Sequence, residues 1–157
     1  MVPGAVNLEE VLKGSSEHST FFKLLQESQL SKELVSPYTI FAPTNQAFMK
    51  LSDESQHKIF GDSKMAENVL RNHIVQDVVC CSAVPSYLLF SRGERTIGGH
   101  SIHLRRTSGG RVLVNKGTIE RCDIVAENGI MHSIDAVILP KILQSNEQEK
   151  TRMFWSF

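Results

Sequence analysis

The second half of the chain is a series of short runs rich in β-branched residues, and this series restricts the fold more than any other feature. Such runs favour strands, because branched side chains pack well on a pleated surface. Turn signals such as Ser108-Gly109-Gly110 and Asn128-Gly129 separate most of the runs. The predicted strands lie within residues 78–84, 100–106, 111–115, 118–126 and 130–139.

The first half of the chain has a helical pattern instead. Apolar residues recur at spacings of three and four within residues 6–14, 19–35 and 64–75, as in helices that bury one face. One short run, Tyr38 to Pro43, reads as a buried strand among these helices. Helices followed by strands that tight turns connect predict an α+β fold, in which helices pack on the side of an antiparallel sheet or sandwich.

Length and charge limit the classes of function. The 157 residues suit one domain, which we assign to residues 1–140, followed by a polar linker or tail with an aromatic end at 141–157. Lys plus Arg and Asp plus Glu both number 17, so the zero net charge argues against nucleic acid as a partner. We interpret Arg105, Arg106 and Arg111 as the solvated face of a hairpin. No apolar run reaches the roughly 18 residues of a membrane span, so we expect no direct membrane insertion.

Residues 132–135 include side chains of the types that hydrolases use, namely His132, Ser133 and Asp135. Successive side chains of a strand point to opposite faces, so His132 cannot use its neighbour Ser133 as a nucleophile. A hydrolase that combines His132 and Asp135 with a distant serine, such as Ser101, is therefore the alternative hypothesis. The chain lacks the common sequence signatures of hydrolases, metalloproteases and nucleotide-binding enzymes, and we predict no catalytic residue.

His100 and His103 are three residues apart, which would suit metal binding on a helix. On the predicted strand the two side chains point to opposite faces. We therefore predict neither a metal site nor a cofactor.

Three sequence blocks carry a resemblance to a known family. They are "YTIFAPTNQAF" at 38–48, "VLRNHIV" at 69–75 and "NGIMHSIDAVILP" at 128–140. In this order and at these separations they resemble the conserved blocks of the fasciclin-type adhesion domain. The resemblance extends over residues 6–140 and implies a twisted β-sandwich with helices packed on its flank. It also implies that His132, Ser133 and Asp135 belong to the strand signature of the family.

Within that family, the sequence around the cysteines is most similar to the fasciclin domains of stabilins, which are endocytic scavenger receptors. This resemblance implies a non-enzymatic, extracellular adhesion or ligand-binding module within the ectodomain of a single-pass plasma-membrane receptor. The expected partners are protein or glycan ligands, including integrins, and the expected oligomeric state is a monomer. Hyaluronan binding in such receptors is expected of a link module, so we do not expect this domain alone to bind hyaluronan.

Two short sites of the family map onto this chain. Many fasciclin domains carry a Tyr-His pair implicated in integrin adhesion; His73 matches the histidine, but Asn72 replaces the tyrosine. His73 lies on the apolar face of its predicted helix, so we expect a buried histidine that hydrogen-bonds nearby backbone. An Asp-Ile pair proposed as an integrin contact matches Asp123 and Ile124. Because Ile124 suits the core, Asp123 is the candidate adhesion residue.

Three cysteines in an extracellular domain allow one disulfide and leave one thiol free. Cys80 and Cys81 are adjacent on the predicted strand, where their Cβ atoms point apart, so a bond between them would be strained. We expect Cys122 to pair with one of them. The alternation of apolar residues does not decide which, because both faces of the strand carry apolar side chains. Three buried, inert thiols are the alternative.

Overall fold

Side-chain caps mark where helices of the N-terminal half begin. The Asn7 side chain accepts a hydrogen bond from the backbone N–H of Glu10 at 2.9 Å. The Thr44 hydroxyl accepts one from the backbone N–H of Ala47 at 3.3 Å. Each cap satisfies a donor that the first turn of a helix leaves unpaired, so both helices begin where the local sequence supplies a short polar side chain.

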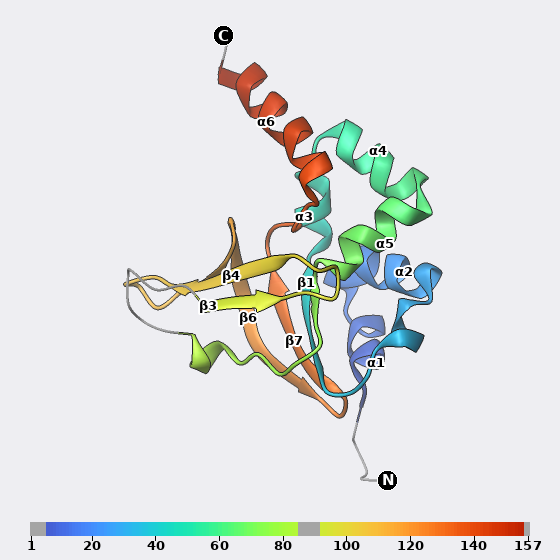
Figure 1. Ribbon diagram of the computed structural model, residues 1–157, viewed down its shortest axis with the longest axis vertical. Helices are drawn as coiled ribbons and strands as arrows, with labels where there is room; N and C mark the ends of the chain where they lie inside the picture. Colours follow the sequence, from blue (N-terminus) through green and yellow to red (C-terminus); the bar gives the residue numbers. More distant parts are fainter. Residues whose placement is uncertain (1–5, 85–91, 156–157) are drawn as a thin grey trace.

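The structure is a computed structural model that describes residues 6–84 and 92–155. Most of its helices lie in the first half of the chain, and they gather on one side of the sheet (Figure 1). The described helices are α1 (Leu8–Lys13), α2 (Ser19–Ser28), α3 (Asn45–Met49), α4 (Asp53–Gly61), α5 (Ser63–Arg71) and, at the end of the chain, α6 (Lys141–Trp155). Short 3-10 turns cover Ser16–His18 (η1), Leu30–Glu33 (η2) and Cys81–Ala83 (η3).

The strands form one seven-stranded sheet in the order β2-β1-β7-β6-β5-β4-β3. Their bounds are β1 (Tyr38–Pro43), β2 (Ile74–Val75), β3 (Arg92–Arg95), β4 (Ser101–Arg106), β5 (Val112–Val114), β6 (Gly117–Ala126) and β7 (Gly129–Ile134). All neighbours are antiparallel except β1 and β7, which are parallel. The α+β prediction is confirmed, but the sheet is mixed and not antiparallel. Tight turns can only impose antiparallel pairs, and β1 and β7 meet through tertiary packing.

The junction of β1 and β7 depends on a glycine. Gly129 begins β7 opposite Tyr38 of β1, and a Cβ atom at this position would overlap the Tyr38 carbonyl oxygen. Only glycine allows so close an approach of two backbones. The Asn128-Gly129 pair therefore serves both as the turn after β6 and as the contact between β7 and β1.

Both faces of β1 are buried, and a separate core covers each face. Ile40 belongs to the core that the helices close, together with Phe21 of α2 and Leu70 of α5. Its neighbour Phe41 points into a second core. Burial on both faces explains why every residue from Tyr38 to Pro43 is buried, without the alternation of a half-exposed strand.

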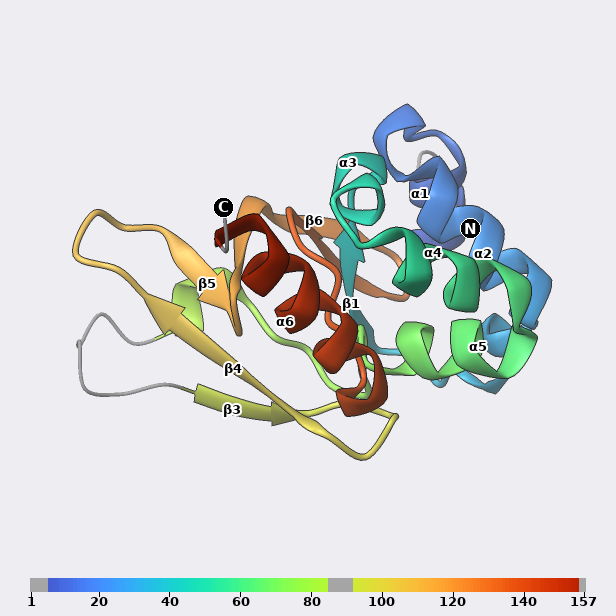
Figure 2. The same ribbon diagram turned by 90° about the horizontal axis from the view of Figure 1, so that it is seen from above.

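The second core lies between the two halves of the sheet, which bends so that β3 and β4 cross over β6 and β7 (Figures 1 and 2). Phe41 of β1 and Ile134 of β7 meet Ile102 and Leu104 of β4 within it. This arrangement agrees with the twisted sandwich that the family resemblance implies. On the other face of β1, α1, α2 and α5 close the first core.

Residues 78–84, predicted as a strand, form a loop that ends in η3. Side chains, and not a neighbouring strand, satisfy the backbone of this segment. The Thr39 hydroxyl accepts from the N–H of Val79 at 2.9 Å, and the Asp123 carboxylate accepts from that of Cys81 at 2.9 Å. The apolar residues Val79 and Val84 nevertheless pack into the second core, which explains their strand-like pattern.

The segment after Pro140, expected to be a polar linker or tail, forms α6. Leu143 in its first turn is fully buried in the core that the helices close, and Glu147 accepts a hydrogen bond from the backbone N–H of Ser52 at 2.8 Å. The start of α6 is thus anchored, while its far end leads away from the domain (Figure 1). Residues 156–157 of the aromatic end lie outside the described residues. Among the helices described, none is long and apolar enough to cross a membrane.

Candidate functional site

The candidate adhesion residue Asp123 lies in a bulge of β6. Arg121 pairs with Ser133 of β7 and Ile124 pairs with Met131, so two residues of β6, Cys122 and Asp123, oppose one residue of β7. Asp123 has a φ of +55°, a left-handed conformation that aspartate adopts more readily than most residues. The extra residue redirects the side chains at this point of the strand.

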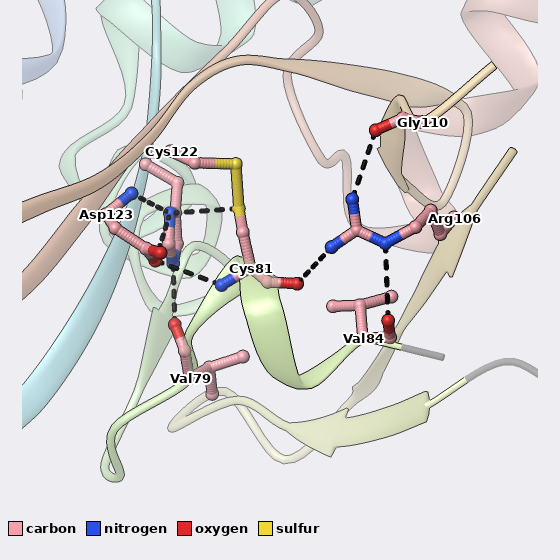
Figure 3. The surroundings of a disulfide bond; sticks show 8 residues. Val79, Cys81, Val84, Arg106, Gly110, Cys122 and Asp123 are labelled. Atoms are coloured by element: carbon pink, nitrogen blue, oxygen red, sulfur yellow. Dashed lines mark hydrogen bonds and ion pairs between the residues drawn. A yellow bond between two sulfur atoms is a disulfide. The ribbon is translucent and has the colours of Figure 1, made fainter. Parts of the chain in front are cut away.

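The bulge places the Asp123 carboxylate next to the backbone N–H of Cys81 and the buried ring of His132 (Figure 3). Its Oδ1 atom accepts the hydrogen bond from the backbone N–H of Cys81 and lies 3.8 Å from Nδ1 of His132. The backbone N–H of Asp123 donates to the same Nδ1 atom at 3.0 Å. Even so, 37% of the side chain remains exposed. Asp123 is therefore an oriented carboxylate that a partner can reach.

His132 supports the bulge from the core. Its side chain is buried, lies 5.2 Å from the ring of Phe41 between centroids, and donates from Nε2 to the carbonyl of Val79 at 2.6 Å. Because Nδ1 accepts from Asp123, these two hydrogen bonds require the neutral ring with its proton on Nε2. Burial lowers the pKa of His132 against the opposing effects of the Val79 carbonyl and the Asp123 carboxylate.

A disulfide joins Cys81 of η3 to Cys122 in the bulge (Figure 3). Of the two partners that the sequence left open for Cys122, the structure selects Cys81, and Cys80 is a free, half-buried thiol. Cys81 itself is buried, whereas Cys122 is exposed. The disulfide thus ties the loop before β3 to the strand that carries Asp123.

Arg106 holds the other side of this loop. Its guanidinium donates to the carbonyls of Cys81 at 2.5 Å, Val84 at 3.4 Å and Gly110 at 3.1 Å (Figure 3). The cluster expected to be a solvated hairpin face therefore has one member with a structural role. Only Arg105 and Arg111 of the three arginines remain exposed.

Ile124 and Val125 follow the bulge and differ in exposure. Ile124 is half-buried and packs against the core that the helices close, as expected. Val125 is 71% exposed and was missed as a candidate contact. The alternation of a strand contains the signal for it, because an inward Ile124 requires an outward Val125. The exposed surface of β6 therefore offers a carboxylate and an aliphatic side chain on either side of Ile124.

The structure lends no support to the hydrolase alternative. His132 uses both ring nitrogens for backbone groups, and Asp135 accepts from the backbone N–H of Thr118 at 2.7 Å. Ser101 lies exposed in β4, paired with Arg95 of β3. No hydrogen bond among the described residues joins His132, Asp135 and Ser101. The adjacent serine, Ser133, bonds instead to a buried histidine on the other face, His18, at 2.8 Å.

His73 lies just after α5 and is fully buried. Its helix was expected to continue through residue 75 but ends at Arg71, because the chain turns there to form β2. Nδ1 of His73 donates to the carbonyl of Val69 at 2.6 Å, and Nε2 accepts from the backbone N–H of Ile138 at 2.8 Å. Burial lowers the pKa of His73 to about 4, so the ring is neutral.

The remaining candidates form no common site. Asn72, next to His73, is nearly buried and lines a surface pocket together with Thr96, His100 and Lys141. His103 lies exposed within β4, whereas His100 precedes the strand. Across residues 6–84 and 92–155, the three metal-binding side chains that lie within mutual reach are Cys81, Cys122 and His132, and not this histidine pair.

Comparison with known proteins identifies the family. The fasciclin domain family model matches residues 16–140. Pig (Sus scrofa) transforming growth factor-beta-induced protein ig-h3 is 27% identical over 94% of this chain, which spans 21% of that protein. Mouse (Mus musculus) stabilin-1 is 29% identical over 83% of this chain, which spans only 5% of the receptor.

The fold agrees with this match. The solved structure of a FAS1 domain pair from the insect cell adhesion molecule fasciclin I is similar with a TM-score of 0.75, over 87% of this chain and 52% of that one. At 19% identity this likeness shows the fold alone. The fasciclin-type fold predicted from three sequence blocks is thus confirmed, and the chain belongs to the fasciclin domain family.

Proposed function

We propose that this chain is a non-enzymatic, extracellular module that binds a protein or glycan partner in cell adhesion, with an integrin as the first candidate. The observation that carries the proposal is the oriented, partly exposed carboxylate of Asp123 in the β6 bulge. Exposed Val125 lies two residues away and adds apolar contact area. A fixed charge beside an aliphatic side chain suits a specific protein interface, because the charge orients the partner and the apolar group excludes water.

The disulfide supports the extracellular location. Disulfides persist in oxidising compartments and are rare where glutathione and thioredoxin keep thiols reduced. The bond between Cys81 and Cys122 links the bulge to η3, so the compartment and the geometry of the proposed contact are connected.

We further propose that the domain is one ectodomain unit of a single-pass endocytic scavenger receptor similar to the stabilins. The similarity to stabilin-1 supports this context, and the small share of that receptor that the chain spans fits a single unit among many. We expect the isolated domain to be a monomer. Its zero net charge and the structural role of Arg106 argue against a polyanion site, so hyaluronan is not the proposed ligand.

An adhesion assay with a charge-only substitution tests the proposal. The domain is immobilised, and the attachment of integrin-expressing cells is compared with that on an inert protein. Asp123→Asn is the key variant, because asparagine keeps an oxygen for the Cys81 N–H and tolerates a positive φ, so it removes only the charge. We expect Asp123→Asn and Val125→Ser to reduce attachment at least tenfold.

Glu120→Gln is the matched control, since Glu120 is an exposed carboxylate three residues away on the same strand. Its attachment should equal that of the wild type, and all three variants should keep the wild-type melting temperature within about 2 °C. Attachment no greater than on the inert protein would refute the adhesion function. Full attachment of Asp123→Asn would refute the role of this carboxylate. Turnover of generic ester or peptide substrates would instead revive the hydrolase hypothesis.

A further inference from the structure

The disulfide and a buried histidine together form a cluster of possible metal ligands beside the proposed adhesion contact. Sγ of Cys81, Sγ of Cys122 and Nδ1 of His132 all lie within 4.8 Å of one another. We propose that reduction of the disulfide converts this cluster into a zinc site, in which the two thiolates and His132 bind Zn²⁺ and Asp123 supplies the fourth ligand. Cysteine, histidine and aspartate in this combination are ligands that zinc prefers.

The distances fit a tetrahedral zinc ion. Zinc bonds of about 2.3 Å to sulfur and 2.0–2.1 Å to nitrogen imply a sulfur to nitrogen separation of about 3.6 Å. Sγ of Cys81 lies 3.7 Å from Nδ1 of His132. Oδ1 of Asp123 lies 3.8 Å from the same nitrogen, but Asp123 is outside the group of ligand atoms that lie within 4.8 Å of one another, so its side chain must turn towards the sulfurs to bind. The two sulfurs must separate to about 3.8 Å, which side-chain rotation after reduction can provide.

The histidine already has the protonation state of a zinc ligand. Ligating histidines usually donate their second ring N–H to a carbonyl or carboxylate, which fixes the tautomer. Nε2 of His132 donates to the Val79 carbonyl, so Nδ1 carries the lone pair, and this atom lies 3.7 Å from Sγ of Cys81. The group that now uses this lone pair is the backbone N–H of Asp123, which the metal would replace.

The surroundings suit the charge of the proposed site. Zinc with two thiolates and one carboxylate has a net charge of about −1. The guanidinium of Arg106 lies next to the cluster and donates to the carbonyl of Cys81 (Figure 3). Cys81 and His132 are buried while Cys122 is exposed, so the site combines a dry interior with an entry path.

The redox step requires an external reductant, namely a protein dithiol that reaches the extracellular domain, because the proposed compartment does not itself keep thiols reduced. A thiolate attacks the sulfur of Cys122, the exposed partner, and Cys81 leaves as a thiolate. A second thiol then resolves the mixed disulfide, so that two external thiols become one external disulfide and the protein gains two cysteine thiols. Zn²⁺ then binds and releases two protons. Disulfide and zinc are thus alternative links between η3 and β6.

Cobalt binding by the full chain tests the proposal. Cys80→Ser removes the free thiol, and the protein is reduced with a phosphine, which leaves no competing thiol. Co²⁺ then reports thiolate ligands through charge-transfer absorption and tetrahedral geometry through its ligand-field bands. We expect both signals to saturate at one equivalent in the reduced protein, to be absent from the oxidised protein, and to disappear when Zn²⁺ is added.

Two variants in the Cys80→Ser background serve as matched comparisons. Cys122→Ser resembles the reduced parent in lacking the disulfide, but it also lacks one ligand, so its affinity for Co²⁺ should be at least 100-fold weaker. Asp123→Asn keeps the disulfide and should bind at least tenfold more weakly after reduction. His103→Gln removes a histidine outside the cluster and should bind like the parent.

Three results would overturn the proposal. The first is the absence of cobalt signals from a reduced parent whose circular dichroism shows it to be folded. The second is a cobalt affinity of Cys122→Ser equal to that of the reduced parent. The third is a cobalt affinity of Asp123→Asn equal to that of the parent, which would refute only the role of Asp123 as the fourth ligand. If reduction unfolds the domain, Zn²⁺ must restore the spectrum of the oxidised protein, and failure to do so refutes the site. None of these results depends on cell attachment, so the proposed adhesion function is tested separately.

Discussion

Lowering the pH from 7 to 5 should destabilise this domain through His73, a histidine that the folded protein keeps neutral. The ring is fully buried and uses its N–H for the Val69 carbonyl and its lone pair for the N–H of Ile138. A proton on Nε2 would break the second hydrogen bond and place a charge in the core. Unfolding removes both obstacles, so only the unfolded chain takes up the proton in this pH range.

The magnitude follows from the two pKa values of His73. Burial lowers the pKa from 6.5 to about 4 in the folded state. Because the folded-state pKa is the lower one, the stability that neutral His73 contributes is present above about pH 6.5 and is lost as the pH falls towards 4. At pH 5 the loss amounts to about 2 kcal/mol, and it approaches about 3 kcal/mol near pH 4.

Urea unfolding at pH 7 and pH 5, followed by circular dichroism, measures this loss when the wild type is compared with His73→Gln. Glutamine stays neutral and carries both a donor and an acceptor, so the variant should lose about 2 kcal/mol less than the wild type between the two pH values. The comparison is necessary because burial also lowers the pKa values of His18 and His132, which add to the wild-type loss.

His57→Gln, at an exposed position of α4, controls for the removal of a histidine as such. Equal losses in the wild type and His73→Gln would refute the reasoning. In a second experiment at pH 7, His73→Ala should cost about 1–3 kcal/mol, because it leaves two buried backbone groups without their partner. An unchanged melting curve of this variant would argue that His73 is not a structural residue.

The remaining predictions concern the disulfide, the C-terminal helix and the ligand. Alkylation of the denatured, non-reduced protein should label one thiol, Cys80, by mass spectrometry, and three labelled thiols would contradict the disulfide. Replacing Cys81 and Cys122 by alanine should lower the free energy of unfolding by about 4 kcal/mol in the chain-entropy account, since the loop spans 41 residues. Leu143→Ala should lower the free energy of unfolding by about 2–4 kcal/mol in urea. Deletion of 153–157 should leave the melting temperature nearly unchanged. A small effect of Leu143→Ala together with a large effect of the deletion would show that the far end of α6, and not its first turn, anchors the helix. Calorimetry at physiological salt should detect no hyaluronan binding, and a dissociation constant in the micromolar range or tighter would refute this.

Sequence patterns predicted those features that depend on short stretches of chain. The run rich in β-branched and aromatic residues at 38–43 and the run after Asn128-Gly129 became β1 and β7, because such short runs pack well as strands. Opposite orientation of His132 and Ser133 also followed from strand geometry alone, and the two residues do face different partners. The expectation that His73 is buried and bonds to backbone rested on the apolar face of a helix predicted to reach residue 75; the ring is buried and bonded in this way, although α5 ends at Arg71.

Tertiary contacts decided where a segment had two acceptable environments. Residues 78–84 carry a strand pattern, but Thr39 and Asp123 satisfy their backbone groups from other parts of the chain, so no neighbouring strand is needed. The sequence likewise showed the middle of α6 as polar, and among the side chains of α6 that the structure describes it is Leu143 that is buried. One buried apolar side chain beside an exposed one, Ile142, produces no recognisable period.

The choice between Cys80 and Cys81, and the position of Asp123, both depend on the bulge in β6. A bulge is one extra residue in a strand, and its location is set by how β6 fits against β7 and not by a composition that a reader of the sequence can recognise. Placed opposite His132, it brings Cys122 to Cys81 and turns the carboxylate of Asp123 towards the Cys81 N–H. The sequence by itself determined that a cysteine pair and an acidic residue lie in this region; only the packing of two strands determined that they meet.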